Sequence, residues 1–309
     1  MKVAIVGAGG IGGYFGGVLA KRGHEVHLLA RGANLEAVKS RGMEIRTPEG
    51  SYVAPVFAVA TADELGDPEL AILAVKSYSL PEVTPALRRL AKQGTTILPL
   101  MNGIGINDRL TESGVGPESQ LGGLTFVGAT RTAPGVVERF TPFQRIVLGE
   151  LDHTMSRRAE TIVEVLLGAG VDAKASDRIE VEQWQKFIFI SALAAVCGLT
   201  RSSIGPVRSA LLGPSLIERA VEEAARVARA SGVSLPAGEE ARVQKLIHEL
   251  PPVAKPSFLL DLLKGGPTEV DMLSGAVSRL GTKFGVPTPI HDACTVAAAT
   301  SVAAAQANV

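Results

Sequence analysis

A glycine-rich loop directly after the first apolar run constrains the fold of this chain more than any other feature. Residues 3–17 read VAIVGAGGIGGYFGG, so Gly7, Gly9 and Gly12 follow a β-branched run with the spacing GxGxxG. Gly7 permits a tight turn, Gly9 lets a ligand approach the backbone, and Gly12 lets the next helix pack closely on the strand. The stretch therefore predicts a strand, a turn and a helix at the start of an α/β unit.

This arrangement is typical of dinucleotide binding, because a helix N-terminus presents backbone N–H groups to a diphosphate. The loop residues expected at the cofactor are Gly7, Ala8, Gly9, Gly10, Ile11 and Gly12. FAD uses the same loop, but the further segments that usually accompany a flavin are not found, so a nicotinamide is the simpler inference.

The second apolar run, EVHLLAR, ends in Arg31, where folds that prefer NAD usually carry an acid for the ribose 2′-hydroxyl. A guanidinium at this place can pair with a 2′-phosphate through charged hydrogen bonds. We therefore expect NADP(H) as the cofactor. The alternative is a solvated arginine that merely starts a helix.

The first half of the chain alternates short apolar runs with helical patterns, which predicts a parallel sheet with helices on both faces. Strand patterns continue near residues 120–149 and vanish after a long helix that starts at about Arg178. We expect an α/β Rossmann-type domain at residues 1–176 and an all-α domain at residues 177–309, with a ligand cleft between them.

The composition argues against several classes of protein. The 31 Lys and Arg balance the 31 Asp and Glu, so no net field recruits nucleic acid or an anionic membrane. The longest uncharged run, residues 187–200, falls short of the roughly 20 residues that cross a bilayer. Cys197 and Cys294 lie far apart and the 5 His show no metal-ligand spacing, so we expect neither a disulfide nor a metal site. No signal-peptide pattern precedes the first strand, which favours a cytoplasmic location.

Two polar residues follow apolar runs of the α/β half. Lys76 ends AILAVK and Asn102 follows TTILPLM, so both are expected at the carboxyl edge of the sheet, where ligands bind in such folds. Asn102 can donate and accept hydrogen bonds, which suits a ribose, a carboxamide or a substrate carbonyl. The alternatives are a surface lysine and a turn-forming Asn-Gly.

Two further residues suggest proton chemistry. Lys186 follows Trp184 at the start of the apolar run, where partial desolvation would lower its pKa and suit it to protonate a carbonyl oxygen. The alternative is a lysine whose stem lies along apolar surface while its ammonium reaches water. Glu269 is expected to open a later helix, where the helix dipole alone would explain an acid. Close to Lys186, it would instead hold the ammonium and could bind a substrate hydroxyl.

Taken together, these residues resemble the ketopantoate reductases (2-dehydropantoate 2-reductases), which reduce 2-dehydropantoate to pantoate with NADPH on the way to pantothenate and coenzyme A. The resemblance covers essentially the whole chain and rests on GAGGIGG at 7–13, Arg31, VKSY with Lys76, NGIG at 102–105, GATRTAPGVV at 128–137, WQK at 184–186 and PSFLLDLLKGGPTEVDMLSG at 256–275. It implies a Rossmann-type N-terminal domain, a helical C-terminal domain and a homodimer.

The resemblance also implies roles for single residues. The glycine loop and Arg31 would bind the NADPH phosphates, Lys76 and Asn102 would meet the nicotinamide ribose, and Ala129 would offer backbone contacts there. Lys186 would be the catalytic lysine that polarises and protonates the keto oxygen. The residues implied to contact the substrate, a small 2-oxo acid, are Asn102, Lys186, Ser257 and Glu269, with Ser257 at the carboxylate and Glu269 assisting the lysine.

The chain departs from the family pattern on one helical face. Ile190 and Ala194 stand four and eight residues after Lys186, where the family commonly has asparagines that bind the polar end of ketopantoate. Neither side chain can donate a hydrogen bond, so a buried substrate hydroxyl would lose about 1–3 kcal/mol per group. Ser191 lies about 100° around the helix and cannot simply replace them.

Three hypotheses therefore stay open. The first is an NADPH-dependent reductase of 2-dehydropantoate, and the second is a reductase of a different, less polar 2-oxo acid by the same mechanism. The third is a non-catalytic NADP(H)-binding protein, against which the presence of Lys186, Ser257 and Glu269 together argues.

Overall fold

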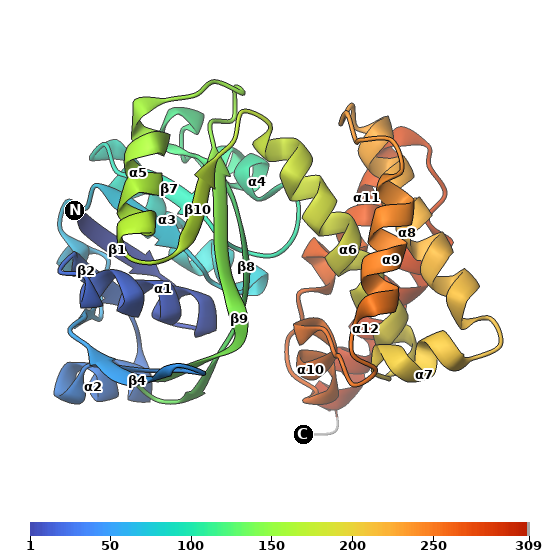
Figure 1. The fold of residues 1–309 in the computed structure, drawn as a ribbon, viewed down its shortest axis with the longest axis horizontal. Coiled ribbons are helices and arrows are strands. Elements are labelled where there is room, and N and C mark those ends of the chain that lie inside the picture. Colours follow the sequence, from blue (N-terminus) through green and yellow to red (C-terminus); the bar gives the residue numbers. More distant parts are fainter. Residues whose placement is uncertain (308–309) are drawn as a thin grey trace. The chain divides into compact units, whose positions relative to one another are not determined.

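The computed structural model describes residues 1–307, which form two compact units. The first unit is Met1–Met101 with Ile106–Ile179, and the second is Asn102–Gly105 with the chain from Glu180 onward. The sequence-based division after residue 176 assigns Asn102 to the first domain, whereas the contacts group Asn102–Gly105 with the second unit. Figure 1 shows strands and helices in the first unit and helices in the second.

The first sheet of the first unit is parallel and has the strand order β5-β2-β1-β6-β7. Its strands are β1 (Lys2–Val6), β2 (Glu25–Leu29), β5 (Phe57–Val59), β6 (Leu70–Leu73) and β7 (Thr96–Pro99). The helices that alternate with them are α1 (Gly10–Lys21), α2 (Gly32–Arg41), α3 (Leu80–Lys92) and α4 (Ile106–Glu112). The predicted parallel α/β architecture is therefore confirmed.

A second, mixed sheet in the same unit has the order β10-β9-β3-β4, with β8 paired to β9. Its strands are β3 (Met43–Thr47), β4 (Gly50–Ala54), β8 (Gly122–Ala133), β9 (Val136–Gly149) and β10 (Asp172–Ala175), and helix α5 (Arg157–Gly168) joins β9 to β10. The strand patterns near residues 120–149 are the antiparallel pair β8 and β9. The hairpin β3-β4 was not predicted, although MEIRT and GSYVA flank a short Pro-containing turn.

Helix α1 lies between these two sheets, and its glycines make the close approach possible. A Cβ on Gly16 would lie 3.0 Å from Ile5 of β1, and a Cβ on Gly17 would lie 2.6 Å from Ile45 of β3. Phe15 is fully buried between them. Each glycine costs a helix about 1 kcal/mol relative to alanine, a cost that contact with two sheets offsets.

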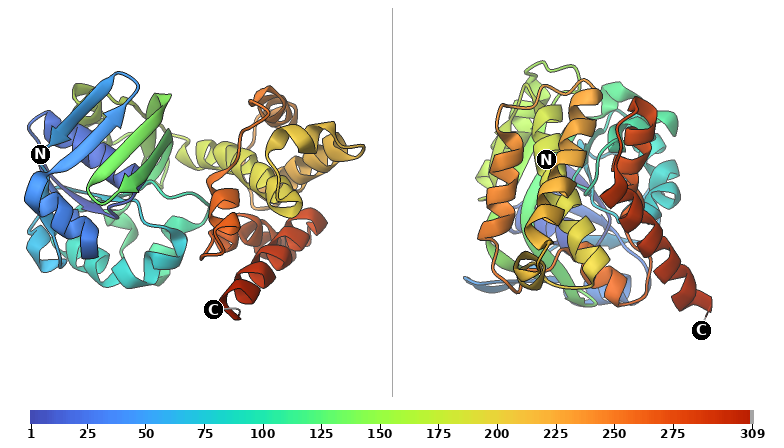
Figure 2. Two further views of the ribbon diagram at one scale, coloured as in Figure 1. Left: turned by 90° about the horizontal axis from the view of Figure 1, so that it is seen from below. Right: turned by 90° about the vertical axis from the view of Figure 1, so that its right-hand side faces the viewer.

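The second unit contains helices and no strand among the described residues (Figure 2). The helices are α6 (Ile179–Thr200), α7 (Ile204–Ser209), α8 (Gly213–Ala230), α9 (Glu239–Glu249), α10 (Ser257–Leu263), α11 (Ser274–Phe284) and α12 (Pro289–Ala307). The apolar run of α6 is buried in a core of its own, where the ring of Trp184 meets Phe187 edge to face at 5.4 Å. The predicted all-α second half is confirmed.

The helix expected to open at Glu269 is interrupted. Glu269 precedes a single 3₁₀ turn, η4 (Val270–Met272), and α11 begins only at Ser274. Leu273 causes the break, because its φ of −109° and ψ of −104° are not helical. The expectation that Glu269 opens a helix was therefore wrong, because Glu269 precedes a single 3₁₀ turn and the α-helix begins five residues later.

A buried carboxylate fixes the start of α12. Glu223 of α8 is almost fully buried and accepts hydrogen bonds from the backbone N–H groups of Ile290 and His291, each at 3.1 Å. These are two of the N–H groups that a helix leaves without a partner in its first turn. Burial raises the pKa of Glu223, while the two N–H groups lower it. The contact therefore ties α8 to α12 through the interior of the unit.

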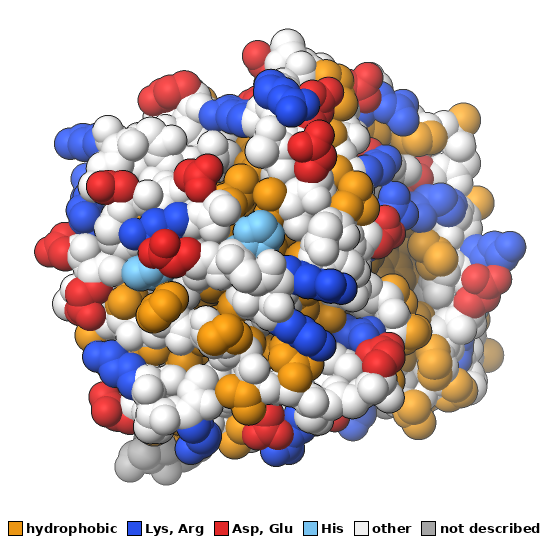
Figure 3. All heavy atoms as spheres, turned by 60° about the vertical axis from the view of Figure 1, so that its left-hand side comes forward, with side chains coloured by type: hydrophobic (Ala, Val, Ile, Leu, Met, Phe, Trp, Pro, Cys, Tyr) orange, Lys and Arg blue, Asp and Glu red, His pale blue; other side chains and the backbone are white. Residues whose placement is uncertain are grey.

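The molecular surface carries charges of both signs. On the face in Figure 3, Lys and Arg side chains alternate with Asp and Glu, and no single sign dominates. This mixture agrees with the balanced composition of the chain. Within residues 1–307, no helix is long and apolar enough to cross a membrane.

We predict that Glu223→Ala lowers the free energy of unfolding of the second unit by about 2 kcal/mol, because two buried N–H groups lose their acceptor. The fluorescence of Trp184, the single tryptophan of the chain, follows unfolding of this unit in urea. The control is Glu222→Ala on the exposed side of α8, which should change stability by less than about 0.5 kcal/mol. Equal effects of the two substitutions would contradict the capping role.

Candidate active site

The glycine loop has the backbone that its sequence predicts. Gly7 has a φ of +120°, and a Cβ there would lie 2.6 Å from the carbonyl oxygen of Ala74, which follows β6. A Cβ on Gly12 would lie 2.1 Å from the carbonyl oxygen of Gly7. Both distances are far below van der Waals contact, so only glycine fits at these two positions. The loop is thus held against the strands on one side and against α1 on the other.

The same loop is open at its centre. A Cβ on Gly9 would meet no atom within 4 Å, whereas one on Gly10 would lie 2.3 Å from the carbonyl oxygen of Ala129 in β8. Gly9 is the N-cap of α1 and no side chain caps that helix. Ala8 and Ile11 are partly buried against the core. Open space in front of uncapped helix N–H groups fits a diphosphate, so the loop suits the dinucleotide predicted from the sequence.

Arg31 and Lys76 lie at the same edge of the sheet as this loop. Arg31 is the N-cap of α2, directly after β2, and Lys76 precedes the 3₁₀ turn η2 (Ser77–Ser79) after β6. Because β2 and β6 are the two neighbours of β1, both side chains flank the glycine loop. Arg31 pairs with Glu82 in the first turn of α3. Sequence reasoning missed Glu82, which stands 51 positions away from Arg31 in the chain.

The second unit brings three of the predicted residues together. The ammonium of Lys186 on α6 donates a hydrogen bond of 2.9 Å to the side-chain oxygen of Asn102. The carboxylate of Glu269 acts on Lys186 electrostatically and is itself 3% exposed. Lysine, amide and carboxylate from three distant parts of the chain therefore form one cluster, as the sequence alone could not establish.

The backbone of residues 102–105 explains how Asn102 reaches this cluster. Gly103 has a φ of +116°, and a Cβ there would lie 2.7 Å from the carbonyl oxygen of Met272 in η4. Ile104 packs against the core of the second unit. The Asn-Gly pair is thus a turn that needs positive φ, and that turn is also what presents the Asn102 amide to Lys186.

Burial and the Glu269 carboxylate act on the pKa of Lys186 in opposite directions. Burial lowers the pKa of Lys186 from 10.5 to about 8, because the charged form loses hydration, and the Glu269 carboxylate opposes this by favouring the ammonium. Such a lysine is protonated at neutral pH yet releases its proton more readily than one in water. An ammonium has three N–H donors, so it can hold Asn102 and also donate to a keto oxygen.

The rest of the α6 face beyond Lys186 is apolar. Ile190 is partly buried, and Ala194 is almost fully buried in the core of the unit. Ser191 is fully buried and its hydroxyl donates to the carbonyl oxygen of Ile188 at 3.4 Å, so it does not replace an asparagine. Ser257, the predicted contact of the substrate carboxylate, is exposed at the first residue of α10.

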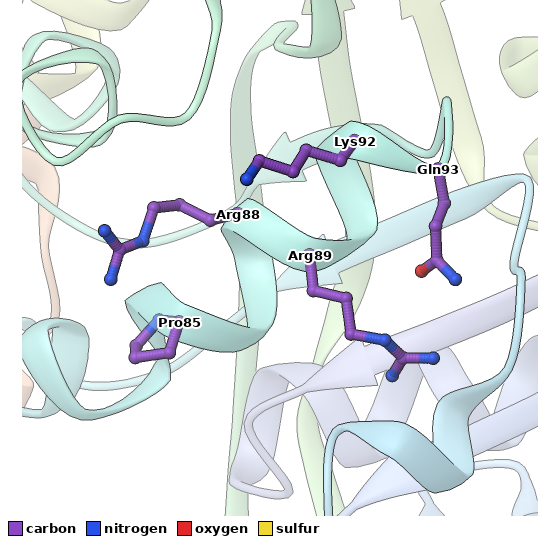
Figure 4. A pocket seen from close by; sticks show the side chains of 5 residues that line it. All are labelled: Pro85, Arg88, Arg89, Lys92 and Gln93. Carbon is purple, nitrogen blue, oxygen red and sulfur yellow. The ribbon is translucent and has the colours of Figure 1, made fainter.

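Two other features carry no chemistry of this kind. No group of three or more His, Cys, Asp or Glu side chains within the described part of the chain could hold a metal ion. A hollow of about 460 Å³ on α3 is lined by Pro85, Arg88, Arg89, Lys92 and Gln93. Arg88 and Arg89 point apart (Figure 4), and Arg89 pairs with Asp63 at 3.2 Å, so the charges do not converge on a ligand.

Comparisons with known proteins agree with the geometry. The family model described as "Ketopantoate reductase PanE/ApbA" matches residues 3–153, and its C-terminal counterpart matches residues 178–300. A 2-dehydropantoate 2-reductase of Mesorhizobium japonicum is 31% identical, in an alignment that covers 95% of this chain and 95% of that one.

Solved structures resemble the whole chain as well. A ketopantoate reductase of the same family from Ralstonia eutropha superposes with a TM-score of 0.90 at 26% identity, over 99% of this chain and 100% of that one. A D-mandelate dehydrogenase solved with NADH and anilino(oxo)acetate gives the same TM-score, identity and coverage.

We predict that Gly9→Ala leaves the fold intact but weakens NADP⁺ binding by at least about tenfold, because its methyl group enters the open space at the start of α1 where we expect the diphosphate. Titration calorimetry measures the binding, and the thermal midpoint reports the fold. Gly12→Ala is the contrasting variant and should lower stability by about 1–3 kcal/mol, because its Cβ meets backbone. Unchanged NADP⁺ binding by Gly9→Ala would show that the ligand lies elsewhere.

Proposed function

We propose that this chain, which belongs to the ketopantoate reductase family of oxidoreductases, reduces the keto group of a 2-oxo acid with NADPH. The first substrate we propose is 2-dehydropantoate, which would be reduced to pantoate for the synthesis of pantothenate and coenzyme A. The homodimer that the family resemblance implies stays a prediction.

The observation that carries this proposal is the Lys186 cluster. A partly buried lysine with a pKa lowered to about 8, hydrogen-bonded to an amide and under the electrostatic influence of a carboxylate, is suited to act as a general acid toward a carbonyl oxygen. The ammonium also offers positive charge where an alkoxide develops during reduction. A protein that only binds NADP(H) has no need for such a group.

The residues divide the reaction between them. When bound, NADPH would supply the hydride to the keto carbon and leave as NADP⁺. Lys186 donates a proton to the keto oxygen and regains one from solvent, so the 2-oxo acid gains one hydride and one proton and becomes the 2-hydroxy acid. Asn102 is a positioning residue, because its side-chain oxygen holds the Lys186 ammonium in place. Glu269 favours the protonated lysine and can accept a hydrogen bond from the new hydroxyl.

The first unit would hold the cofactor. The uncapped start of α1 and the open space at Gly9 suit the diphosphate, and Ala129 lies against the loop through its backbone. We propose that Arg31 binds the 2′-phosphate, with Lys76 close to the ribose on the β6 side. Arg31 is exposed and carries a guanidinium that can bind phosphate in a bidentate manner.

A second candidate substrate is a 2-oxo acid with an apolar or aromatic side chain. Ile190 and Ala194 give α6 an apolar face beyond Lys186, where the hydroxyl end of 2-dehydropantoate would find no donor. The similarity to a D-mandelate dehydrogenase that binds anilino(oxo)acetate favours this candidate, since that molecule carries a ring beside its 2-oxo acid. The proposed roles of Lys186 and Glu269 are the same for both substrates.

We predict that Lys186→Ala lowers kcat/KM for 2-oxo acid reduction by at least about 100-fold, because positioned proton transfer contributes that much or more. The wild-type kcat/KM should fall by about tenfold per pH unit above pH 8, since Lys186 then loses the proton that it must donate. Steady-state oxidation of NADPH between pH 6 and about 10 gives both results. A loss of less than about tenfold in Lys186→Ala would refute the general-acid role.

We predict that Glu269→Gln moves the alkaline fall of kcat/KM to lower pH. The carboxylate raises the pKa of Lys186 against the effect of burial, so without it the lysine deprotonates earlier. The control is Asp271→Asn, two residues away, where the exposed carboxylate pairs with Arg279. An unshifted profile in Glu269→Gln would leave Glu269 with a structural role only.

We predict that substrate preference follows the apolar face of α6. If the second candidate is right, 2-oxo-2-phenylacetate should have a higher kcat/KM than 2-dehydropantoate. Ile190→Asn should lower the ratio of these two kcat/KM values by about tenfold, because the asparagine can form one hydrogen bond with the hydroxyl of 2-dehydropantoate. The assay is a panel of 2-oxo acids with NADPH. Faster turnover of 2-dehydropantoate by the wild type would instead support the first candidate.

A further inference from the structure

The ion pair between Arg31 and Glu82 spans the edge of the sheet at which the glycine loop lies. Arg31 follows β2 and Glu82 lies shortly after β6, and β1 runs between these two strands. The guanidinium of Arg31 donates to the carboxylate of Glu82. The pair therefore joins the two segments that flank Gly7–Gly12, at the end of the loop where the proposed 2′-phosphate would bind.

Arg31 can readily leave Glu82 and bind another anion. Its side chains are 74% and 57% exposed, and ion pairs at such exposed sites are worth at most about 1 kcal/mol. A phosphate carries more charge than a carboxylate and suits the planar guanidinium better. A 2′-phosphate can therefore displace Glu82 from Arg31, but Glu82 competes for the same donors.

The start of α3 keeps the Glu82 carboxylate near this position. Pro81 and Glu82 both lie in the first turn of the helix, where the positive end of the helix dipole stabilises an anion. Once Arg31 turns to a phosphate, Glu82 remains as a negative charge beside a second one. This repulsion acts on NADPH, and it does not act on NADH, which has a hydroxyl in place of the phosphate.

We propose that Glu82 is a specificity-determining residue, which weakens the preference for NADPH over NADH by competing for Arg31 and repelling the 2′-phosphate. The inference rests on the proposed function, because it takes Arg31 as the group that binds the 2′-phosphate. The Glu82 carboxylate can also accept a hydrogen bond from the 2′-hydroxyl of NADH. An enzyme with this pair uses both cofactors, with a moderate preference for NADPH.

Binding of two cofactor fragments tests the inference without any turnover. The full chain is titrated with 2′,5′-ADP, which carries the 2′-phosphate, and with 5′-ADP, which lacks it. Glu82→Gln should bind 2′,5′-ADP about three to ten times more tightly than the wild type, with 5′-ADP changed by less than about twofold. The gain should shrink at about 0.5 M salt, where the Debye length falls to a few ångström.

The matched control is Glu164→Gln on α5, at the opposite end of the first unit from α2 (Figure 1). It removes the same charge and breaks an equally exposed ion pair, in which Arg157 lies 3.6 Å from Glu164. Its affinity for 2′,5′-ADP should equal that of the wild type. A gain as large as that of Glu82→Gln would mean that net charge is responsible, and it would overturn the inference.

The remaining outcomes separate this inference from the proposed function. If the wild type prefers 2′,5′-ADP and Glu82→Gln does not bind it more tightly, the inference fails and the NADPH assignment stands. Weaker binding by Glu82→Gln would show that Glu82 holds Arg31 ready for the phosphate, which also overturns the inference. A preference for 2′,5′-ADP that appears only in Glu82→Gln supports the inference and overturns the NADPH assignment. If neither the wild type nor Glu82→Gln prefers 2′,5′-ADP, the inference about Glu82 and the NADPH assignment are both wrong.

Discussion

The close packing of α1 between two sheets is the constraint on which the first unit depends. A Cβ on Gly16 would lie tightly against Ile5 of the parallel sheet, and one on Gly17 would force Ile45 of the mixed sheet to move. Because the helix is fixed on both sides, its first turn is fixed as well, and the glycine loop takes a single path into it. The open space at Gly9 is then a consequence of packing elsewhere, and a ligand can use backbone N–H groups that were positioned before it arrives.

In the second unit, burial and charge act against each other on one lysine. Burial alone would lower the pKa of Lys186 and favour a neutral amine, while Glu269 favours the ammonium. The result is a proton held firmly enough to be present at neutral pH and loosely enough to be given up. The chain belongs to the ketopantoate reductase family, and the apolar residue Ile190 on α6 bears on the proposed choice of substrate rather than on the proposed role of Lys186.

The sequence predicted the parallel sheet, the helical second half and the glycine loop, because these depend on local patterns of apolar residues and glycine. It did not predict β3 and β4, which are short strands that pair with each other, while β3 also pairs with β9 from a distant part of the chain. Candidate site residues such as Lys186 and Asn102 could be named from their positions, and Asn-Gly indicated a turn, but only the fold shows that this turn brings Asn102 to Lys186. Glu82 was missed for the same reason, since only the fold brings it to Arg31. The prediction that Glu269 opens a helix was wrong because the backbone at Leu273 is not helical, although the apolar periodicity of the sequence continues through that residue.

The grouping of Asn102–Gly105 with the second unit has a consequence for the covalent organisation of the chain. The backbone passes from one unit to the other three times, after Met101, after Gly105 and after Ile179. A chain cut at residue 176 would thus leave the helical half without the amide that binds its own lysine. The two units pack separately, but four residues of the second unit are encoded within the sequence of the first. Recombination at a single point could therefore not exchange the second unit as an intact module.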